Sequence, residues 1–130
     1  MIKMEPLVNA LNTIMNHETR RKNECIITPA SSLVGRVLRL IQQKGYIGEI
    51  EFIDDGRQGK FRVQLFGRIN ECCAVTPRFS TKAKEMEKWE KRFLPSRDLG
   101  TVILSTPKGV MDHRVAKEQN LGGVVIAFVF

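Results

Sequence analysis

The sequence predicts an α+β protein made of two small packed lobes, and three observations lead to this fold class. Apolar residues recur at helical spacing early in the chain, alternating β-type runs follow, and two further apolar β-type runs lie near the end. With 130 residues, the chain is long enough to bury a core. Its 42% hydrophobic and 27% charged residues are typical of a folded globular protein.

The N-terminal α/β lobe, residues 1–68, is predicted to have the order helix, strand, helix, strand, strand. Apolar residues three and four positions apart predict an amphipathic helix over residues 5–18, with Pro6 in its first turn. Residues 25–28 form a short β-type run, which Pro29 stops.

A second helix and a hairpin complete this lobe. Ser31 or Ser32 can cap the helix, and Gly45 is a natural residue for its C-terminal stop. Residues 46–53 and 61–65 then alternate between apolar and polar side chains on either side of a polar loop. This alternation predicts a hairpin with one buried face.

The C-terminal lobe, residues 69–130, is predicted to be mainly β with short helices. Its first strand, at residues 73–76, is expected to end at Pro77, and a charged helix follows over residues 82–93. The two remaining strands and a helical turn between them are expected at residues 101–105, at residues 123–129 and from near Asp112.

The net charge of +7 favours a polyanionic partner. Lys and Arg residues are spread along the chain, so a binding surface has to be assembled by folding. Because no strongly amphipathic helix gathers these charges, a membrane surface is a weaker partner than RNA. No apolar run approaches the ~20 residues that cross a bilayer, and no secretory signal is visible.

No set of side chains has the pattern of a catalytic or metal site. Asp54 and Asp55 are adjacent in a predicted turn, where Asp is common. The three cysteines lack metal-ligand spacing, and their odd number indicates a reduced, intracellular chain. His17 and His113 are expected to be solvated or to cap a helix. We therefore expect no enzyme activity, no cofactor, no metal and no small-molecule substrate.

The hydroxyl-rich turn from Ser105 to Gly109 is the strongest candidate site. It can be a plain strand-to-helix connection. Two hydroxyls, one Lys and one Gly are also what phosphate and ribose contacts need. The turn does not match the glycine and lysine spacing of a phosphate-binding P-loop.

Basic and aromatic side chains are open to two interpretations. Residues 20–22 and the helix face formed by Arg36, Arg39 and Lys44 can be solvated surface or part of a polyanion-binding surface. The aromatic residues fall mostly on apolar periodicities, so we expect them in the core rather than as stacking platforms. From the residues alone, the chain is predicted to be a basic two-lobe binding module for RNA.

Several motifs run in order along nearly the full chain. They are residues 6–11 (PLVNAL), 27–31 (ITPAS), 45–49 (GYIGE), 52–56 (FIDDG), 67–70 (GRIN), 77–79 (PRF), 94–97 (LPSR), 100–113 and 121–130. With these motifs the chain resembles the family of small-subunit ribosomal protein eight, whose eukaryotic cytosolic member is called fifteen-a. Residues 52–56 and the helix that carries Trp89 resemble the archaeal and eukaryotic branch of that family.

The resemblance implies a structural protein of the cytoplasmic ribosome that binds the central domain of small-subunit ribosomal RNA (rRNA) and supports its assembly. It also implies neighbouring small-subunit ribosomal proteins as partners. In this family the turn that matches residues 105–108 enters the RNA minor groove, whose shallow A-form surface small hydroxyls can reach. The RNA-binding residues carried over by the resemblance are Ser105, Thr106, Lys108, Gly109, Ser31, Ser32, Asn16, Arg36, Gly122 and Gly123.

The chain departs from the family pattern at four positions. Pro107 stands where bacterial members often have Ser, and Val124 stands where they often have Glu. Ser32 replaces a Lys that many members carry, and Phe128 replaces a typical Tyr. Any RNA contact made by these side chains in other members is therefore altered here.

Two other functions remain alternatives at the level of the sequence. A free RNA-binding regulator, such as a translational repressor, would use the same surface. An RNA-acting enzyme on a basic α/β scaffold would need a set of reactive side chains, and the sequence offers none.

Overall fold

Helices and antiparallel sheets build the chain, which confirms the predicted α+β class. The structure is a computed structural model that describes residues 6–28, 30–54, 56, 59–95 and 99–130, without the side chains of Pro6 and residues 76–79. Contacts divide the chain into Met1–Cys72 and Cys73–Phe130, here called unit 1 and unit 2. This division lies a few residues beyond the lobe boundary predicted after residue 68.

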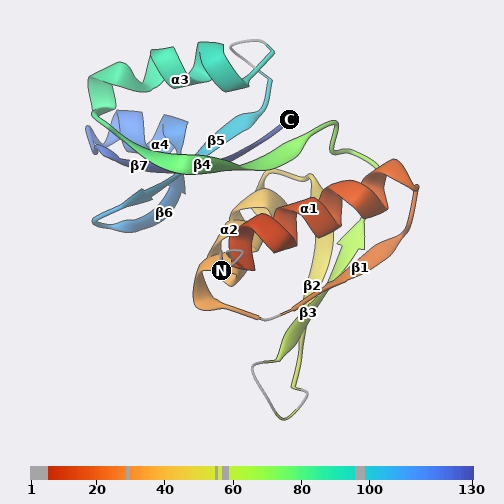
Figure 1. The fold of residues 1–130 in the computed structure, drawn as a ribbon. Helices are drawn as coiled ribbons and strands as arrows, with labels where there is room; N and C mark the ends of the chain where they lie inside the picture. Colours follow the sequence, from red (N-terminus) through yellow and green to blue (C-terminus); the bar gives the residue numbers. More distant parts are fainter. Residues whose placement is uncertain (1–5, 29, 55, 57–58, 96–98) are drawn as a thin grey trace. The chain divides into compact units, whose positions relative to one another are not determined.

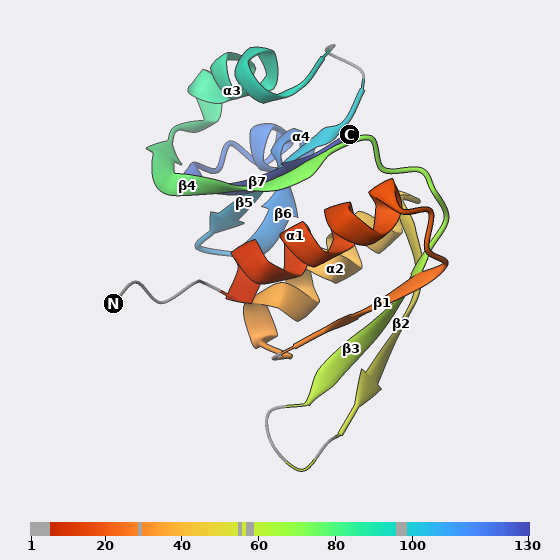
Figure 2. The same cartoon turned by 45° about the vertical axis from the view of Figure 1, so that its right-hand side comes forward.

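Unit 1 has the predicted order of elements, and its two helices cover one face of a small sheet (Figures 1 and 2). Antiparallel strands form the sheet in the order β1-β3-β2. The bounds are α1 Pro6–Thr19, β1 Glu24–Ile27, α2 Ser32–Gln43, β2 Ile47–Ile53 and β3 Lys60–Leu65. The loop predicted between β2 and β3 lies partly outside the described residues.

Local sequence explains why α2 forms where it does. The Ser31 hydroxyl accepts a hydrogen bond from the Val34 N–H at 3.1 Å, which satisfies one of the free donors at the start of the helix. Val34, Val37, Leu38 and Ile41 are the buried residues of the helix, as their spacing predicts. After α2, Gly45 has a φ of +82°, a conformation that suits glycine at the end of a helix.

Cys25 lies in the core of unit 1. The residue is buried in β1, and its burial raises the pKa of the thiol to about 11. A thiol with this pKa stays protonated at neutral pH and behaves as a small apolar side chain.

Unit 2 contains one antiparallel sheet with the strand order β4-β7-β5-β6. Helices α3 and α4 lie on the same side of this sheet in both views (Figures 1 and 2). The bounds are β4 Cys72–Thr81, the 3-10 turn η1 Ala83–Glu85, α3 Met86–Phe93, β5 Thr101–Thr106, β6 Gly109–Asp112, α4 His113–Glu118 and β7 Gly123–Val129. β4 begins on the last residue of unit 1.

Three sequence predictions for unit 2 were wrong in detail. The first strand does not end at Pro77 but continues to Thr81. β4 is an edge strand, so a proline can lack its donor without breaking the pairing with β7. The predicted helix over residues 82–93 begins as a 3-10 turn, and the turn after β5 leads into the unpredicted strand β6 rather than directly into a helix.

A row of aromatic rings is built into the core of unit 2. Trp89 and Phe93 stack with ring centroids 5.8 Å apart, and Phe93 stacks on Phe128 at 5.0 Å. Phe128 in turn lies 6.2 Å from Phe130. Phe128 therefore uses its ring for packing between Phe93 and Phe130. The buried residues of this core are Val75, Met86, Trp89, Leu94, Val102, Leu104, Ala116 and Val125.

His113 joins three elements of unit 2, which corrects the expectation that it is solvated or caps a helix. Only 1% of the residue is exposed. Its Nδ1 accepts a hydrogen bond from the Val102 N–H at 3.1 Å, and its Nε2 lies 3.4 Å from a carboxylate oxygen of Glu90 in α3. The cap of α4 is instead Asp112, whose carboxylate accepts from the Val115 N–H at 3.1 Å.

Burial lowers the pKa of His113, because the charged imidazolium loses its hydration. Protonation of Nδ1 would also replace the bond from Val102 with two facing N–H groups. The Glu90 carboxylate acts in the opposite direction, but burial is the larger effect. The folded protein therefore holds His113 neutral at a pH where the unfolded chain already takes up a proton.

We predict that the stability of unit 2 falls as the pH drops below about 6.5, the usual histidine pKa. The unfolded chain then binds a proton that folded His113 refuses, so unfolding becomes more favourable. Urea unfolding of the whole protein, followed through the fluorescence of its single tryptophan, Trp89, measures this loss. Between pH 7.5 and 5.5, the free energy of unfolding should change less for His113→Gln than for the parent. Equal slopes for the two proteins would contradict the prediction.

Candidate nucleic-acid interface

The hairpin of β5 and β6 presents the hydroxyl-rich turn that the sequence singles out. Thr106 pairs with Gly109 across the hairpin, so Pro107 and Lys108 form its exposed tip. Pro107 fixes its own φ near the value that a tight turn needs, and Gly109 has a φ of +119° that other residues rarely adopt. The backbone conformations that Pro107 and Gly109 prefer therefore stabilise the turn.

Thr106 and Ser105 use their hydroxyls differently. Thr106 is buried, and its hydroxyl donates to the Gly109 carbonyl at 2.8 Å and accepts from the Lys108 N–H at 3.2 Å. This hydroxyl is therefore committed to the shape of the turn. Ser105 is half-buried, and its hydroxyl makes no hydrogen bond with the residues described in the structure. Of the two, Ser105 retains the free donor that a ligand can use.

Gly122 and Gly123 allow neighbouring strands of the sheet to pack closely. A Cβ on Gly123 would overlap the Ser105 carbonyl oxygen, and a Cβ on Gly122 would lie 2.7 Å from the Thr81 carbonyl oxygen. Only glycine lets β7 begin this close to the two neighbouring backbones. The structure thus brings Gly123 together with the hairpin, and it gives both glycines a structural role.

The other predicted residues lie in unit 1. Ser31 is the cap of α2, and Ser32 and Arg36 are exposed in the first turns of that helix. Asn16 is exposed near the end of α1, and no hydrogen bond links its side chain to the described residues of α2. The predicted site residues therefore form one group on or beside the hairpin and a second group at the start of α2, and Asn16 lies outside both groups.

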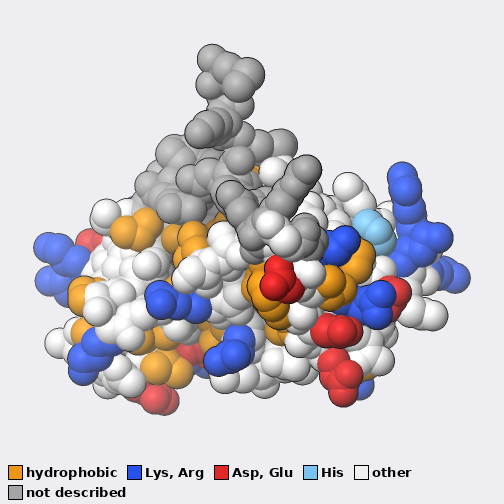
Figure 3. Space-filling view, turned by 90° about the horizontal axis from the view of Figure 1, so that it is seen from below, with side chains coloured by type: hydrophobic (Ala, Val, Ile, Leu, Met, Phe, Trp, Pro, Cys, Tyr) orange, Lys and Arg blue, Asp and Glu red, His pale blue; other side chains and the backbone are white. Residues whose placement is uncertain are grey.

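The charge pattern fits a ligand that is bound at several places. On the face seen in Figure 3, Lys and Arg side chains are scattered among polar and hydrophobic ones, with Asp and Glu between them.

Within the described residues, no group of three or more His, Cys, Asp or Glu is placed to hold a metal ion. No helix in that part of the chain is long and apolar enough to cross a membrane.

A comparison with protein-family models identifies the chain's relatives. The model described as ribosomal protein S8 matches residues 5–130, which is nearly all of the sequence. The chain belongs to the ribosomal protein S8 family. Membership makes it a structural protein of the small ribosomal subunit that binds rRNA and contacts other ribosomal proteins.

Two features of this S8-family chain were missed by the sequence analysis. Phe52 and Phe66 were expected in the core, but 58% of Phe52 and 48% of Phe66 are exposed. Phe66 is covered on one ring face by the Arg68 guanidinium, 4.9 Å from the ring centroid. Alternation correctly indicates which sheet face a side chain is on, but not whether a helix extends far enough to cover it.

We predict that Thr106→Val destabilises unit 2, whereas Ser105→Ala does not. Valine keeps the shape of the side chain but removes two hydrogen bonds, which costs about 1–3 kcal/mol at ~0.5–1.5 kcal/mol each. Ser105→Ala should change the free energy of unfolding by less than about 0.5 kcal/mol. Urea unfolding followed by Trp89 fluorescence gives both values. Equal losses in the two variants would mean that Thr106 does not support the turn.

Proposed function

We propose that this S8-family protein binds the central domain of small-subunit rRNA and places its β5–β6 hairpin in the minor groove of one RNA helix. The proposal rests on the different roles of the Thr106 and Ser105 hydroxyls in the hairpin. Thr106 stiffens the turn from within, which leaves the Ser105 hydroxyl and the exposed Lys108 available to a ligand. A rigid loop with small polar groups suits a shallow A-form groove that displays 2′-hydroxyls and base edges.

The two outward-facing residues have different parts in this proposal. Ser105 holds the RNA at a fixed place through a short, oriented hydrogen bond. Lys108 supplies attraction to phosphate that is independent of base sequence. Ser32, Arg36 and Asn16 contribute further RNA contacts from unit 1, and their exposure supports this role.

We further propose that the chain belongs to the archaeal and eukaryotic branch of the family and works in the cytoplasmic ribosome. Residues 52–56 and the helix with Trp89 support the choice of branch. In this setting the protein supports assembly of the subunit by fixing the fold of the central domain. Co-sedimentation with small subunits after a high-salt wash tests whether it is a stable constituent.

We predict a strong salt dependence for binding to a central-domain rRNA helix. The net charge of +7 supports neutralisation of several phosphates. For ~4–6 phosphates, log K should fall with log salt with a slope of about −3 to −5. Filter binding or fluorescence anisotropy across a range of salt concentrations measures this slope. A flat titration would rule out the electrostatic part of the proposal.

We predict that Ser105→Ala and Lys108→Ala weaken RNA binding in different ways. Ser105→Ala should cost ~1–3 kcal/mol on the cognate helix without changing the salt slope, because its partner is left unsatisfied but no charge is lost. Lys108→Ala should reduce the slope by about 0.7–0.9 and weaken cognate and scrambled helices alike.

Lys84→Ala is the matched control for Lys108→Ala, since Lys84 is an exposed lysine of the same unit outside the hairpin. It should leave the affinity for the cognate helix close to that of the parent. If Ser105→Ala binds the cognate helix as tightly as the parent, the hairpin is only a connection and recognition takes place elsewhere.

A further inference from the structure

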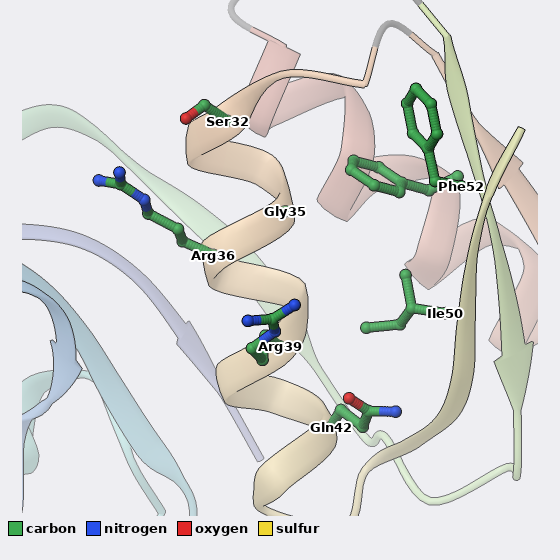
Figure 4. Close-up of a pocket in the computed structure, with 8 residues that line it drawn as sticks. Ser32, Gly35, Arg36, Arg39, Gln42, Ile50 and Phe52 are labelled. Atoms are coloured by element: carbon green, nitrogen blue, oxygen red, sulfur yellow. The ribbon is translucent and has the colours of Figure 1, made fainter. Parts of the chain in front are cut away.

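A groove of about 380 Å³ lies between α2 and β2 in unit 1 (Figure 4). Figure 4 shows Ile50 pointing from β2 towards the helix and Gln42 extending from the helix towards β2. Gln42 is fixed there by a hydrogen bond from its Nε2 to the Gly48 carbonyl at 3.0 Å. The groove is lined by Ser32, Gly35, Arg36, Arg39, Gln42, Ile50, Phe52 and Phe61.

The β2 and β3 side of the groove is aromatic. The rings of Phe52 and Phe61 meet edge to face, with centroids 6.0 Å apart and planes at 65°. A Cβ on Gly35 would lie 3.2 Å from the Phe61 ring, so the bare glycine backbone allows α2 to lie directly against Phe61. Phe52, in contrast, is left 58% exposed. The groove therefore contains an open aromatic face beside a fixed one.

The helix side of the groove is basic. Arg36 and Arg39 are three positions apart and therefore neighbours on the surface of α2. Both are exposed, and neither forms an ion pair with a described carboxylate. In Figure 4, Arg36 extends from the side of α2 that faces away from Phe52. Among the described residues that line the groove there is no Asp or Glu, so within this set the two arginines are the charged side chains.

We propose that this groove holds one unstacked nucleotide of the rRNA, with its base on the ring of Phe52 and its phosphate at Arg39. Arg36, the neighbour of Arg39 one turn earlier on α2, contacts the next phosphate of the strand. The proposal rests on the proposed function, because it needs an RNA already bound to the chain.

Chemistry and size favour a nucleotide over a protein segment. Unpaired bases stack on aromatic side chains, and guanidinium groups bind phosphate oxygens. The exposed ring of Phe52 and the guanidinium of Arg39 therefore offer both contacts of one nucleotide. A groove of about 380 Å³ is near the small end of ligand sites. It matches one base and its sugar better than the length of a docked helix or strand.

Photo-crosslinking tests the location of the contact. Central-domain rRNA transcribed with 5-iodouridine is bound to the whole protein, irradiated, digested and mapped by mass spectrometry. If an unpaired uridine enters the groove, Phe52 should be crosslinked, and Phe66, the control aromatic residue with 48% exposure, should not. An equal yield at Phe66, or crosslinks at the hairpin alone, would overturn the proposal.

Binding measurements test how much Phe52 and Arg39 contribute to the affinity for RNA. Phe52→Leu keeps an apolar side chain but removes the flat ring, and it should weaken binding to RNA with unpaired nucleotides by at least about 5-fold, the lower end for loss of one stacked base. The salt slope should stay the same, and Phe66→Leu should bind like the parent. Arg39→Gln should lower the slope by about 0.7–0.9, in contrast to the control Lys84→Gln. Thermal unfolding verifies that each variant is folded.

A fully paired central-domain helix separates failure of this proposal from failure of the proposed function. The parent and Phe52→Leu should bind it equally, since it has no base to offer the groove. If the parent does not bind the paired helix, the proposed function fails. If the parent binds it but Phe52→Leu has parental affinity on every RNA, the groove proposal alone is wrong. If Phe52→Leu then binds another ribosomal protein more weakly than the parent does, the groove is a binding site for that protein and not for RNA.

Discussion

The close approach of three backbones at Gly122 and Gly123 is the constraint on which unit 2 depends. β7 lies between β4 and β5, and each glycine faces a carbonyl oxygen of one neighbour where no side chain fits. This contact fixes the position of β5 at Ser105, the residue from which the hairpin projects. β5 in turn supplies the Val102 N–H that binds His113, so the attachment of α4 and α3 follows from the same strand.

In two hydroxyl-rich segments of this chain, neighbouring residues have different roles. In α2, Ser31 caps the helix while Ser32 is exposed, and in the hairpin Thr106 braces the turn while Ser105 retains its donor. In each pair one hydroxyl satisfies the protein backbone. The neighbouring residue is then presented on a rigid support, which reduces the entropy that a contact with a ligand would cost.

Hydrophobic periodicity predicted much of the fold, because it reports directly on which face of an element is buried. It located α2, the β2–β3 hairpin and the last strand, but it missed β6, a strand of four residues. Pro77 was a misleading stop signal because its effect depends on the strand being at an edge. The burial of His113 and the exposure of Phe52 arise from packing between elements, which no local pattern contains. For the candidate site, the residue types were evident from the sequence, but only the structure separates the roles of Ser105 and Thr106. Their contacts with RNA stay predictions.

The position of Pro77 in β4 has a consequence for the protein before it meets its RNA. The two edges of the sheet in unit 2 are β4, which contains this proline, and β6, which has four residues. A missing backbone donor and a short ladder both hinder the addition of a strand from another molecule. Both edges of this sheet are thereby poor templates for edge-to-edge association between copies of the chain.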